Sequence, residues 1–245
     1  MAADELVEWY WNIEVGVSEW ATNTASINKY KTGRDESGPT WDARNAVRSA
    51  AQLKHLFPDN SAFQRANYGK VSPLDCEHIL TLAVDTGVVK PEKIQSWANT
   101  NLGVDCTGFA VAYYDWLGII NRNTYSGGIS CPVLVSKAKN NNRASDGGPL
   151  LWSLDDVAVD DFIVWMNEAG KETRAPGHIA VIYDVDYNQG ILYTAESSGS
   201  NDGDGHSGPR LDERNWTGVH SAAPRYIELD HADQVLIVRP PPIFG

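Results

Sequence analysis

Cys106 stands in the sequence context of a nucleophilic thiol. It follows Asp105, precedes Thr107-Gly108-Phe109 and opens a stretch with the composition of a helix. A thiol at a helix N-terminus lies near the positive end of the backbone dipole, which lowers its pKa and favours the reactive thiolate. Asp105 can cap this helix, and the Cys106 N–H, which the helix leaves unpaired, could help hold an oxyanion. Gly108 would let another segment approach closely, and Phe109 would anchor the first turn in the core.

His178 is the candidate base for this thiol. It opens an apolar stretch typical of a strand, in which His178, Ala180 and Ile182 share one face. If that face looks toward the helix, the imidazole can reach Cys106. Glu196, on the next predicted strand, could accept a hydrogen bond from the far ring nitrogen and fix its tautomer, as the third member of a triad does.

Other interpretations of these residues remain open. A single cysteine in a helix is commonly an inert core residue, and a histidine at a strand start is commonly a surface or hydrogen-bonded residue. Glu196 could be an exposed residue at a strand end, in which case Ser197 or Ser198 would supply the third polar contact.

Helices are predicted for most of the first hundred residues. Apolar residues at helical spacing predict a helix over 42–57, and Ser72 and Pro73 are suited to the N-cap and first position of a helix that runs to Gly87. A third helix begins near Pro91, and the helix of Cys106 follows. The Gly-, Asn- and Ser-rich span 125–149 is interpreted as loop with one short helix at most.

The periodicity changes after Asp160. Short β-type runs are predicted at 162–166, 179–185, 191–195 and 235–238, with turn signals between them. Helices followed by strands predict an α+β fold in which an antiparallel sheet packs against the helix that begins at Cys106.

The motif residues resemble those of a known enzyme family. Asp105-Cys106-Thr107-Gly108-Phe109 resembles the Asp-Cys-Ser-Gly-Phe signature of the NlpC/P60 cysteine peptidases, and 161–165 and 177–181 resemble that family's following strand and its histidine strand. The resemblance spans about residues 95 to 240. It implies a papain-like NlpC/P60-type core, with the nucleophile helix packed on an antiparallel β-sheet. The related CHAP amidases more often end in an acidic or amide third residue, as Glu196 would be.

The resemblance also implies roles for individual residues. Cys106 would be the nucleophile, His178 the base and Glu196 the third polar residue, and Asp105 would bind the amino end of the substrate. The chain is thereby divided into a helical N-terminal region, 1–94, whose role is open, and an NlpC/P60-like catalytic domain, 95–245.

The sequence departs from the family pattern in three places. Thr107 replaces the commoner serine and keeps a hydroxyl. Asp160 replaces the glycine that precedes the buried Asp161, so the turn there is expected to differ. The family's oxyanion-stabilising side chain, often an upstream tyrosine, has no clear counterpart; Tyr68 and Trp97 are near in sequence, but neither is assigned.

The function that follows is cysteine-dependent hydrolysis of amide bonds, with the peptides of peptidoglycan as substrate by resemblance. One alternative is an acyltransferase or deamidase that uses the same cysteine and histidine on a protein or lipid. Another is a catalytically silent cell-wall or partner-binding module. An inhibitor or immunity protein is a further partner to expect for a cell-wall enzyme of this kind.

Composition limits the remaining function classes. The formal net charge of −12 argues against nucleic-acid binding, since phosphate contacts need a basic face. No apolar run is long enough to span a membrane, and the N-terminal residues lack the features of a secretory signal. If the substrate is peptidoglycan, we expect secretion, a periplasmic location or delivery to the cell wall; the sequence itself leaves the location open.

Cysteines and histidines give no metal-binding pattern. The histidines lack zinc-ligand spacing, and no phosphate loop is present, so no metal or cofactor is predicted. The segment 201–206, rich in Asp and Gly, is interpreted as a loop near the cleft and not as a calcium site, because Ser207 stands where a calcium loop needs glycine. Cys76 and Cys131 could pair in an oxidising compartment, or all three thiols could be free.

Overall fold

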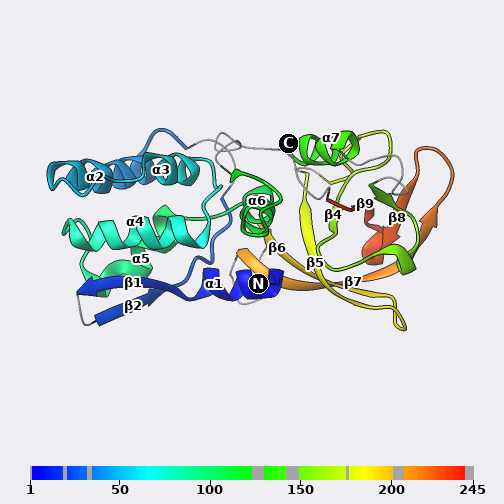
Figure 1. Cartoon of the computed structure of the whole chain (residues 1–245), viewed down its shortest axis with the longest axis horizontal. Helices are drawn as coiled ribbons and strands as arrows, with labels where there is room; N and C mark the ends of the chain where they lie inside the picture. The colour runs from blue at the N-terminus through cyan, green and yellow to red at the C-terminus, as the bar shows by residue number, and fades with distance from the viewer. Residues whose placement is uncertain are drawn as a thin grey trace.

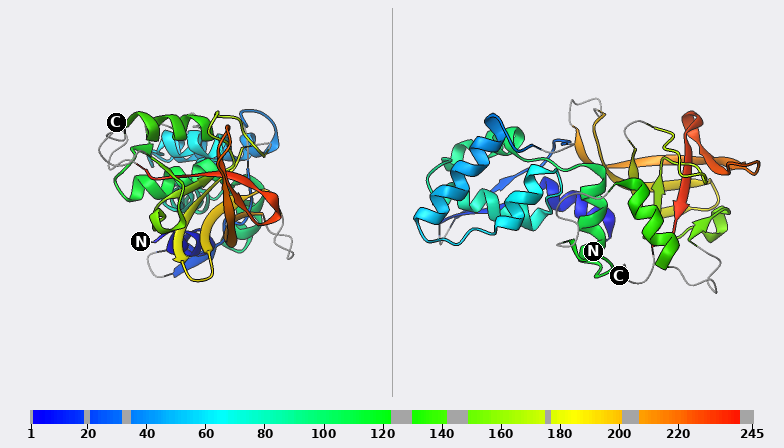
Figure 2. Two further views of the ribbon diagram at one scale, coloured as in Figure 1. Left: turned by 90° about the vertical axis from the view of Figure 1, so that its right-hand side faces the viewer. Right: turned by 90° about the horizontal axis from the view of Figure 1, so that it is seen from above.

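A computed structural model describes residues 2–18, 21–31, 35–122, 130–141, 149–174, 177–200 and 207–240 of the chain. Figure 1 shows helices and a short hairpin at one end of the molecule and strands at the other, with α1 and α6 between them. The view from above in Figure 2 shows the same order. The segment 201–206, predicted to be a loop, lies outside the described residues, as do 125–129 and 142–148 of the span 125–149; the described part of that span contains one helix, Cys131–Asn141.

The helical end is built around an antiparallel hairpin that the sequence analysis did not predict. Strands β1 (Ile13–Ser18) and β2 (Ala21–Ala25) pair with each other, and β1 packs against α4. The helices here are α1 (Ala3–Trp11), α2 (Pro39–Leu53), α3 (Asn60–Asn67), α4 (Pro73–Asp85) and α5 (Ile94–Asn101), with a short 3₁₀ turn η1 (Pro91–Lys93) before α5.

Two helix starts agree with the capping predicted from sequence. Ser72 Oγ accepts a hydrogen bond from the Asp75 N–H, and the Asp75 carboxylate accepts one from the Ser72 N–H, so the two form a capping box at α4. Asp105 caps α6 (Cys106–Trp116) by accepting from the Gly108 N–H. Phe109 lies in the core as predicted, 1% exposed.

The strand end is a closed antiparallel barrel. Each strand from β4 to β8 pairs with the next, and β9 pairs with both β8 and β4, which closes the sheet. The barrel strands are β4 (Phe162–Val164), β5 (Ile179–Asp186), β6 (Ile191–Ser198), β7 (Gly208–His220), β8 (Tyr226–Leu229) and β9 (Gln234–Val238). A short strand β3 (Leu150–Leu151) extends one edge of β9, and helix α7 (Cys131–Asn141) precedes it.

The expected papain-like NlpC/P60-type core is therefore wrong. The protein is α+β, as predicted, but its main sheet is a closed barrel and not an open layer packed on the nucleophile helix. It closes on itself because β9 pairs on one side with β4, at Ile163↔Ile237, and on the other with β8, at Ile227↔Val235. Strands β7 and β8, which the sequence analysis missed, complete this closure.

Strands β4, β5, β6 and β9 bury side chains on both of their faces. One face gives the barrel interior, with residues such as Ile163, Ala180, Leu192 and Ile237. The opposite face of β4, β5, β6 and β9 packs on the helices in a second, larger cluster that continues into the helical end. Because this larger cluster runs from α1 through α6 to the barrel, the first hundred residues and the barrel share one core.

A close chain crossing fixes the first turn of α6. The Asp105 N–H donates to the Gly69 carbonyl at 2.9 Å, so residues 69 and 70 run directly over this turn. A Cβ on Gly108 would lie 2.4 Å from the Gly69 oxygen and 3.0 Å from Lys70 Cα. Gly69 itself has φ +68°, in the left-handed region that favours glycine. The predicted role of Gly108, to allow a close approach, is confirmed.

Within the described residues, no helix is long and apolar enough to cross a membrane.

Replacing Gly108 by alanine should destabilise the fold by about 1–3 kcal/mol, because the added methyl group must displace the backbone of residues 69 and 70. Urea unfolding followed by circular dichroism measures the change. Gly218→Ala is the matched control, since a Cβ there meets nothing within 4 Å. Equal stability of the two variants would contradict the crossing.

Candidate active site

The start of α6 is held at one end of the barrel by three separate segments. Val104 forms bridges with Tyr30 and with Lys70. The Val104 carbonyl also accepts a hydrogen bond from Ser197 Oγ at 2.7 Å. Cys106 therefore lies where the N-terminal segments, the nucleophile helix and the end of β6 meet.

Asp105 is paired within the protein. Lys70 Nζ lies 2.6 and 2.5 Å from its two carboxylate oxygens and also contacts the Thr107 hydroxyl. Asp105 and Lys70 are each 8% exposed. Burial raises the pKa of Asp105 to about 6, although Lys70 acts in the opposite direction. Its role in binding a substrate amine stays a prediction, and any such amine would have to compete with Lys70.

Cys106 and His178 come together as predicted. Their side chains are close enough for each to shift the pKa of the other, and Cys106 Sγ lies 3.8 Å from the Gly177 carbonyl oxygen. Cys106 is 4% exposed and His178 5%. The pKa of Cys106 lies well below its usual range: a hydrogen bond from Cys131 lowers it most, burial opposes this, and His178 lowers it further by hydrogen bond and charge.

Glu196 lies behind His178. Its Oε2 is 3.1 Å from His178 Nε2, but out of line with the ring N–H, so charge rather than a well-directed hydrogen bond holds the pair. Burial by itself would lower the pKa of His178; the carboxylate of Glu196 and the contact with Cys106 outweigh it and raise the pKa to about 9. The imidazolium that results favours the thiolate of Cys106.

Two arginines hold the Glu196 carboxylate. Arg210 donates to Oε1 at 3.0 Å and Arg214 to Oε2 at 3.2 Å, and Glu196 is fully buried. Burial alone would raise the pKa of Glu196, but His178, Arg214 and Arg210 together lower it to about 2. A buried carboxylate with three cationic neighbours stays ionised, so the alternative of an exposed strand-end glutamate is wrong.

The route by which His178 reaches Cys106 differs from the expected one. Ala180 and Ile182 point into the barrel interior and not toward α6. His178 precedes the first residue of β5 and lies at the end of the barrel, where its ring packs on Trp165 with centroids 4.7 Å apart. The contact arises because the start of α6 lies at this same end.

Tyr30 is the site residue that the sequence analysis missed. Its hydroxyl lies 3.7 Å from Cys106 Sγ and also interacts with the Cys106 N–H. Burial and then the charge of Cys106 raise the pKa of Tyr30, so the hydroxyl remains a donor. The sequence analysis found no clear counterpart to the family's upstream tyrosine; Tyr68, which it left unassigned, contacts Glu36. The bridge between Tyr30 and Val104 joins segments that are far apart in the sequence, and no local sequence pattern predicts it.

The other two cysteines are free thiols in different places. Cys131 lies against Cys106, and its contact with Cys106, followed by burial, raises its pKa. Cys76 is fully buried in α4, where burial and the charge of Asp75 raise its pKa. The pairing of Cys76 with Cys131, one of the two alternatives from sequence, is not present.

Asp160 and Asp161 support the barrel and not the site. Asp160 adopts φ +75°, in the left-handed region that favours glycine, and its side chain accepts a hydrogen bond from the Tyr113 hydroxyl. Asp161 is buried and paired with Arg239 at 3.0 Å.

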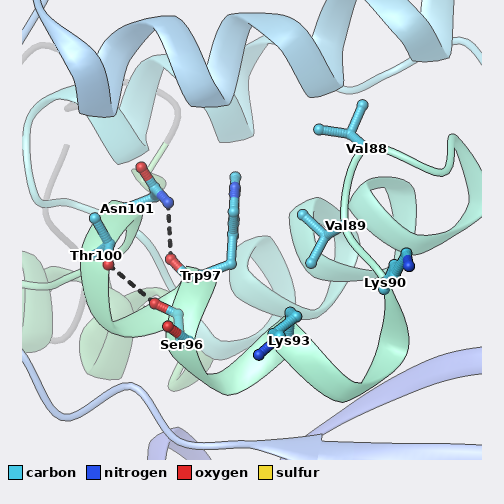
Figure 3. Close-up of a pocket in the computed structure, with 8 residues that line it drawn as sticks. All are labelled: Val88, Val89, Lys90, Lys93, Ser96, Trp97, Thr100 and Asn101. Atoms are coloured by element: carbon cyan, nitrogen blue, oxygen red, sulfur yellow. Dashed lines mark hydrogen bonds between the residues drawn. The ribbon is translucent and has the colours of Figure 1, made fainter.

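Two pockets differ in their position relative to the predicted site residues. Figure 3 shows one of about 390 Å³ on α5 and the loop before it, with Trp97 and Lys93 in its wall. Its Thr100 and Asn101 side chains donate to carbonyls of their own helix, and it contains none of the predicted site residues. A smaller pocket of about 190 Å³ lies directly beside His178 and Tyr30.

Comparison with known proteins finds no family model, no curated protein and no solved structure that matches the chain. The link to the NlpC/P60 and CHAP enzymes therefore rests on the motifs at 105–109, 161–165 and 177–181 alone. The division of the chain at residue 94 stays a prediction, although Tyr30 and Lys70 show that the N-terminal part contributes to the site.

Alkylation of Cys106 by iodoacetamide should reach half its maximal rate well below pH 8.5, the usual pKa of a free thiol. His178→Ala should move this midpoint upward by about 1–3 pH units, because it removes the neighbouring positive charge. Peptide mass spectrometry follows the modification, with the buried Cys76 as an internal reference. An unchanged midpoint would show that His178 does not act on the thiol.

Glu196→Gln should lower the pKa of His178 from about 9 by at least about one unit. The carboxylate favours the imidazolium, so its loss lets the ring release its proton at lower pH. Titration of the imidazole resonances by NMR measures the shift, and the other histidines serve as references. A midpoint that stays near 9 would remove Glu196 from the site.

Proposed function

We propose that this protein is a cysteine-dependent hydrolase of amide bonds. The observation that supports this most directly is the buried series Cys106, His178, Glu196, in which each side chain contacts the next at the N-terminus of α6. Burial alone would oppose each of these charges, yet the pKa of Cys106 is lowered and that of His178 raised. Such opposed shifts on neighbouring groups are typical of a nucleophile and its acid–base partner.

The chemistry follows from these protonation states. The Cys106 thiolate attacks the carbonyl carbon of the amide, and the carbonyl oxygen takes up negative charge beside the Cys106 N–H and the Tyr30 hydroxyl. The His178 imidazolium then protonates the departing amine as the carbon–nitrogen bond breaks, which leaves a thioester. Water, deprotonated by His178, attacks the thioester, the acid departs, and the thiolate and imidazolium are restored.

The substrate class follows from the motif resemblance. We propose the peptides of peptidoglycan, because the residues around Cys106 and His178 resemble those of enzymes that cleave them. The barrel fold lends no support to a particular substrate, so the assignment depends on these motifs.

Cys106→Ala should lower the rate of peptidoglycan digestion more than about a thousandfold and leave the melting temperature within a few degrees of wild type, because only one sulfur is lost at a helix start. Purified sacculi serve as substrate, with released amines and peptides measured by mass spectrometry. Cys76→Ala is the control, since Cys76 lies in α4 away from the site, and it should retain activity. Full activity of Cys106→Ala would overturn the proposal.

A further inference from the structure

The small pocket beside His178 is lined in part by residues that contact the candidate nucleophile. Tyr30, Gly177 and His178 form its wall on the side of the thiol, and each of them contacts Cys106. Its remaining wall is polar and comes from Arg174, Ser198 and Ser200. A group that occupies this pocket would therefore lie next to an amide under attack by Cys106.

Arg174 gives the pocket a positive charge. Its guanidinium carbon lies 5.9 Å from the centroid of the Trp165 ring, and the same ring packs on His178. The Trp165 ring is thus near both the guanidinium and the imidazole. Within the described part of the chain no carboxylate is paired with Arg174, whereas Arg210 and Arg214 are both committed to Glu196.

Neither of the glutamates near this wall, Glu196 and Glu172, lines the pocket. Glu196 lies behind His178, fully buried and shared among His178 and its two arginines. Glu172 packs against Gly177, where its Oε1 would be 2.4 Å from an added Cβ, and it does not line the pocket. The pocket is therefore a local positive site on a chain whose formal net charge is −12.

Two hydroxyl groups complete a site with the donors that a carboxylate needs. Ser198 Oγ and Ser200 Oγ lie 2.9 Å apart in the pocket wall. Between them, Gly199 packs on the Tyr30 ring, because an added Cβ would come within 3.0 Å of Tyr30 Cδ1. A planar guanidinium facing hydroxyl donors is suited to a carboxylate, which can accept from both.

We propose that this pocket binds a carboxylate of the substrate through Arg174 and Ser200, so that the enzyme selects amides with an acidic group next to the scissile bond. This inference rests on the proposed function, because the pocket is defined by its position beside Cys106. Arg174 is a specificity residue here and takes no part in bond cleavage.

Two alkylating reagents of nearly equal size test the subsite without a known substrate. Iodoacetate carries a carboxylate and iodoacetamide is neutral, and each transfers a two-carbon group, carboxymethyl or carbamoylmethyl, to the Cys106 sulfur as iodide departs. Rates at Cys106 are measured for each reagent near pH 6.5 by peptide mass spectrometry. The ratio of the iodoacetate rate to the iodoacetamide rate reports on anion binding, since the reactivity of the thiolate affects both rates alike.

Arg174→Gln should lower this ratio about tenfold, the usual effect of one lost charge-assisted contact, and leave the iodoacetamide rate within about twofold of wild type. Lys171→Gln is the matched control: Lys171 is exposed on the same loop, carries the same charge and does not line the pocket, so the ratio should hold. Arg174→Lys should give an intermediate ratio, because it keeps the charge and loses the planar fork.

The outcomes separate the two proposals. If iodoacetamide labels wild-type Cys106 readily but Arg174→Gln leaves the ratio unchanged, the carboxylate subsite is overturned and the proposed hydrolase stands. An equal fall in the ratio for Lys171→Gln would also overturn it, because a general change of surface charge would then account for the effect. If iodoacetamide fails to label wild-type Cys106 selectively, the proposed function fails and the subsite with it.

Discussion

A buried ion pair holds the start of the nucleophile helix in place. Lys70 contacts both oxygens of Asp105, and the same carboxylate caps α6 at Gly108. Loss of one partner from such a pair leaves an uncompensated buried charge, at a cost of about 3–5 kcal/mol. Because the pair joins the cap of α6 to the segment that crosses it, the position of Cys106 depends on a lysine far earlier in the chain.

From this helix start, charges alternate in sign into the barrel. The thiolate of Cys106 meets the imidazolium of His178, which meets the carboxylate of Glu196, which in turn lies against Arg210 and Arg214. Each charge would be unfavourable in isolation at this depth, and each is stabilised by the next. The arginines thus affect the pKa of the Cys106 thiol only through Glu196 and His178. The low pKa of the nucleophile therefore depends on all of these residues.

Local signals in the sequence predicted the parts of the structure that local interactions determine. Asp105 and Ser72 cap helices as expected, the β-type runs at 162–166 and 179–185 form strands, and Cys106, His178 and Glu196 meet. The caps and strands depend on neighbouring residues, and Glu196 meets His178 through the pairing of the consecutive strands β5 and β6. The contact between His178 and Cys106, in contrast, arises at the end of the barrel and not through the strand face that was expected.

Long-range pairing explains what the sequence did not reveal. Whether β9 joins β4, β8 or both depends on which hydrogen-bonding edges remain free once the other strands have formed, and this decides between an open sheet and a barrel. Tyr30 and Lys70 reach the site through bridges to Val104 that join segments far apart in the chain. No residue pattern around Tyr30 distinguishes it from the other tyrosines.

The order of these residues along the chain bears on how the protein is made. Synthesis runs from the N-terminus, so Cys106 leaves the ribosome before His178 and Glu196 exist. During that interval the charges that lower its pKa are missing, and the thiol is close to an ordinary one with a pKa of about 8.5. The reactive state therefore arises only once β5 and β6 have joined the barrel. A nascent or prematurely ended chain carries the cysteine without its nucleophilicity.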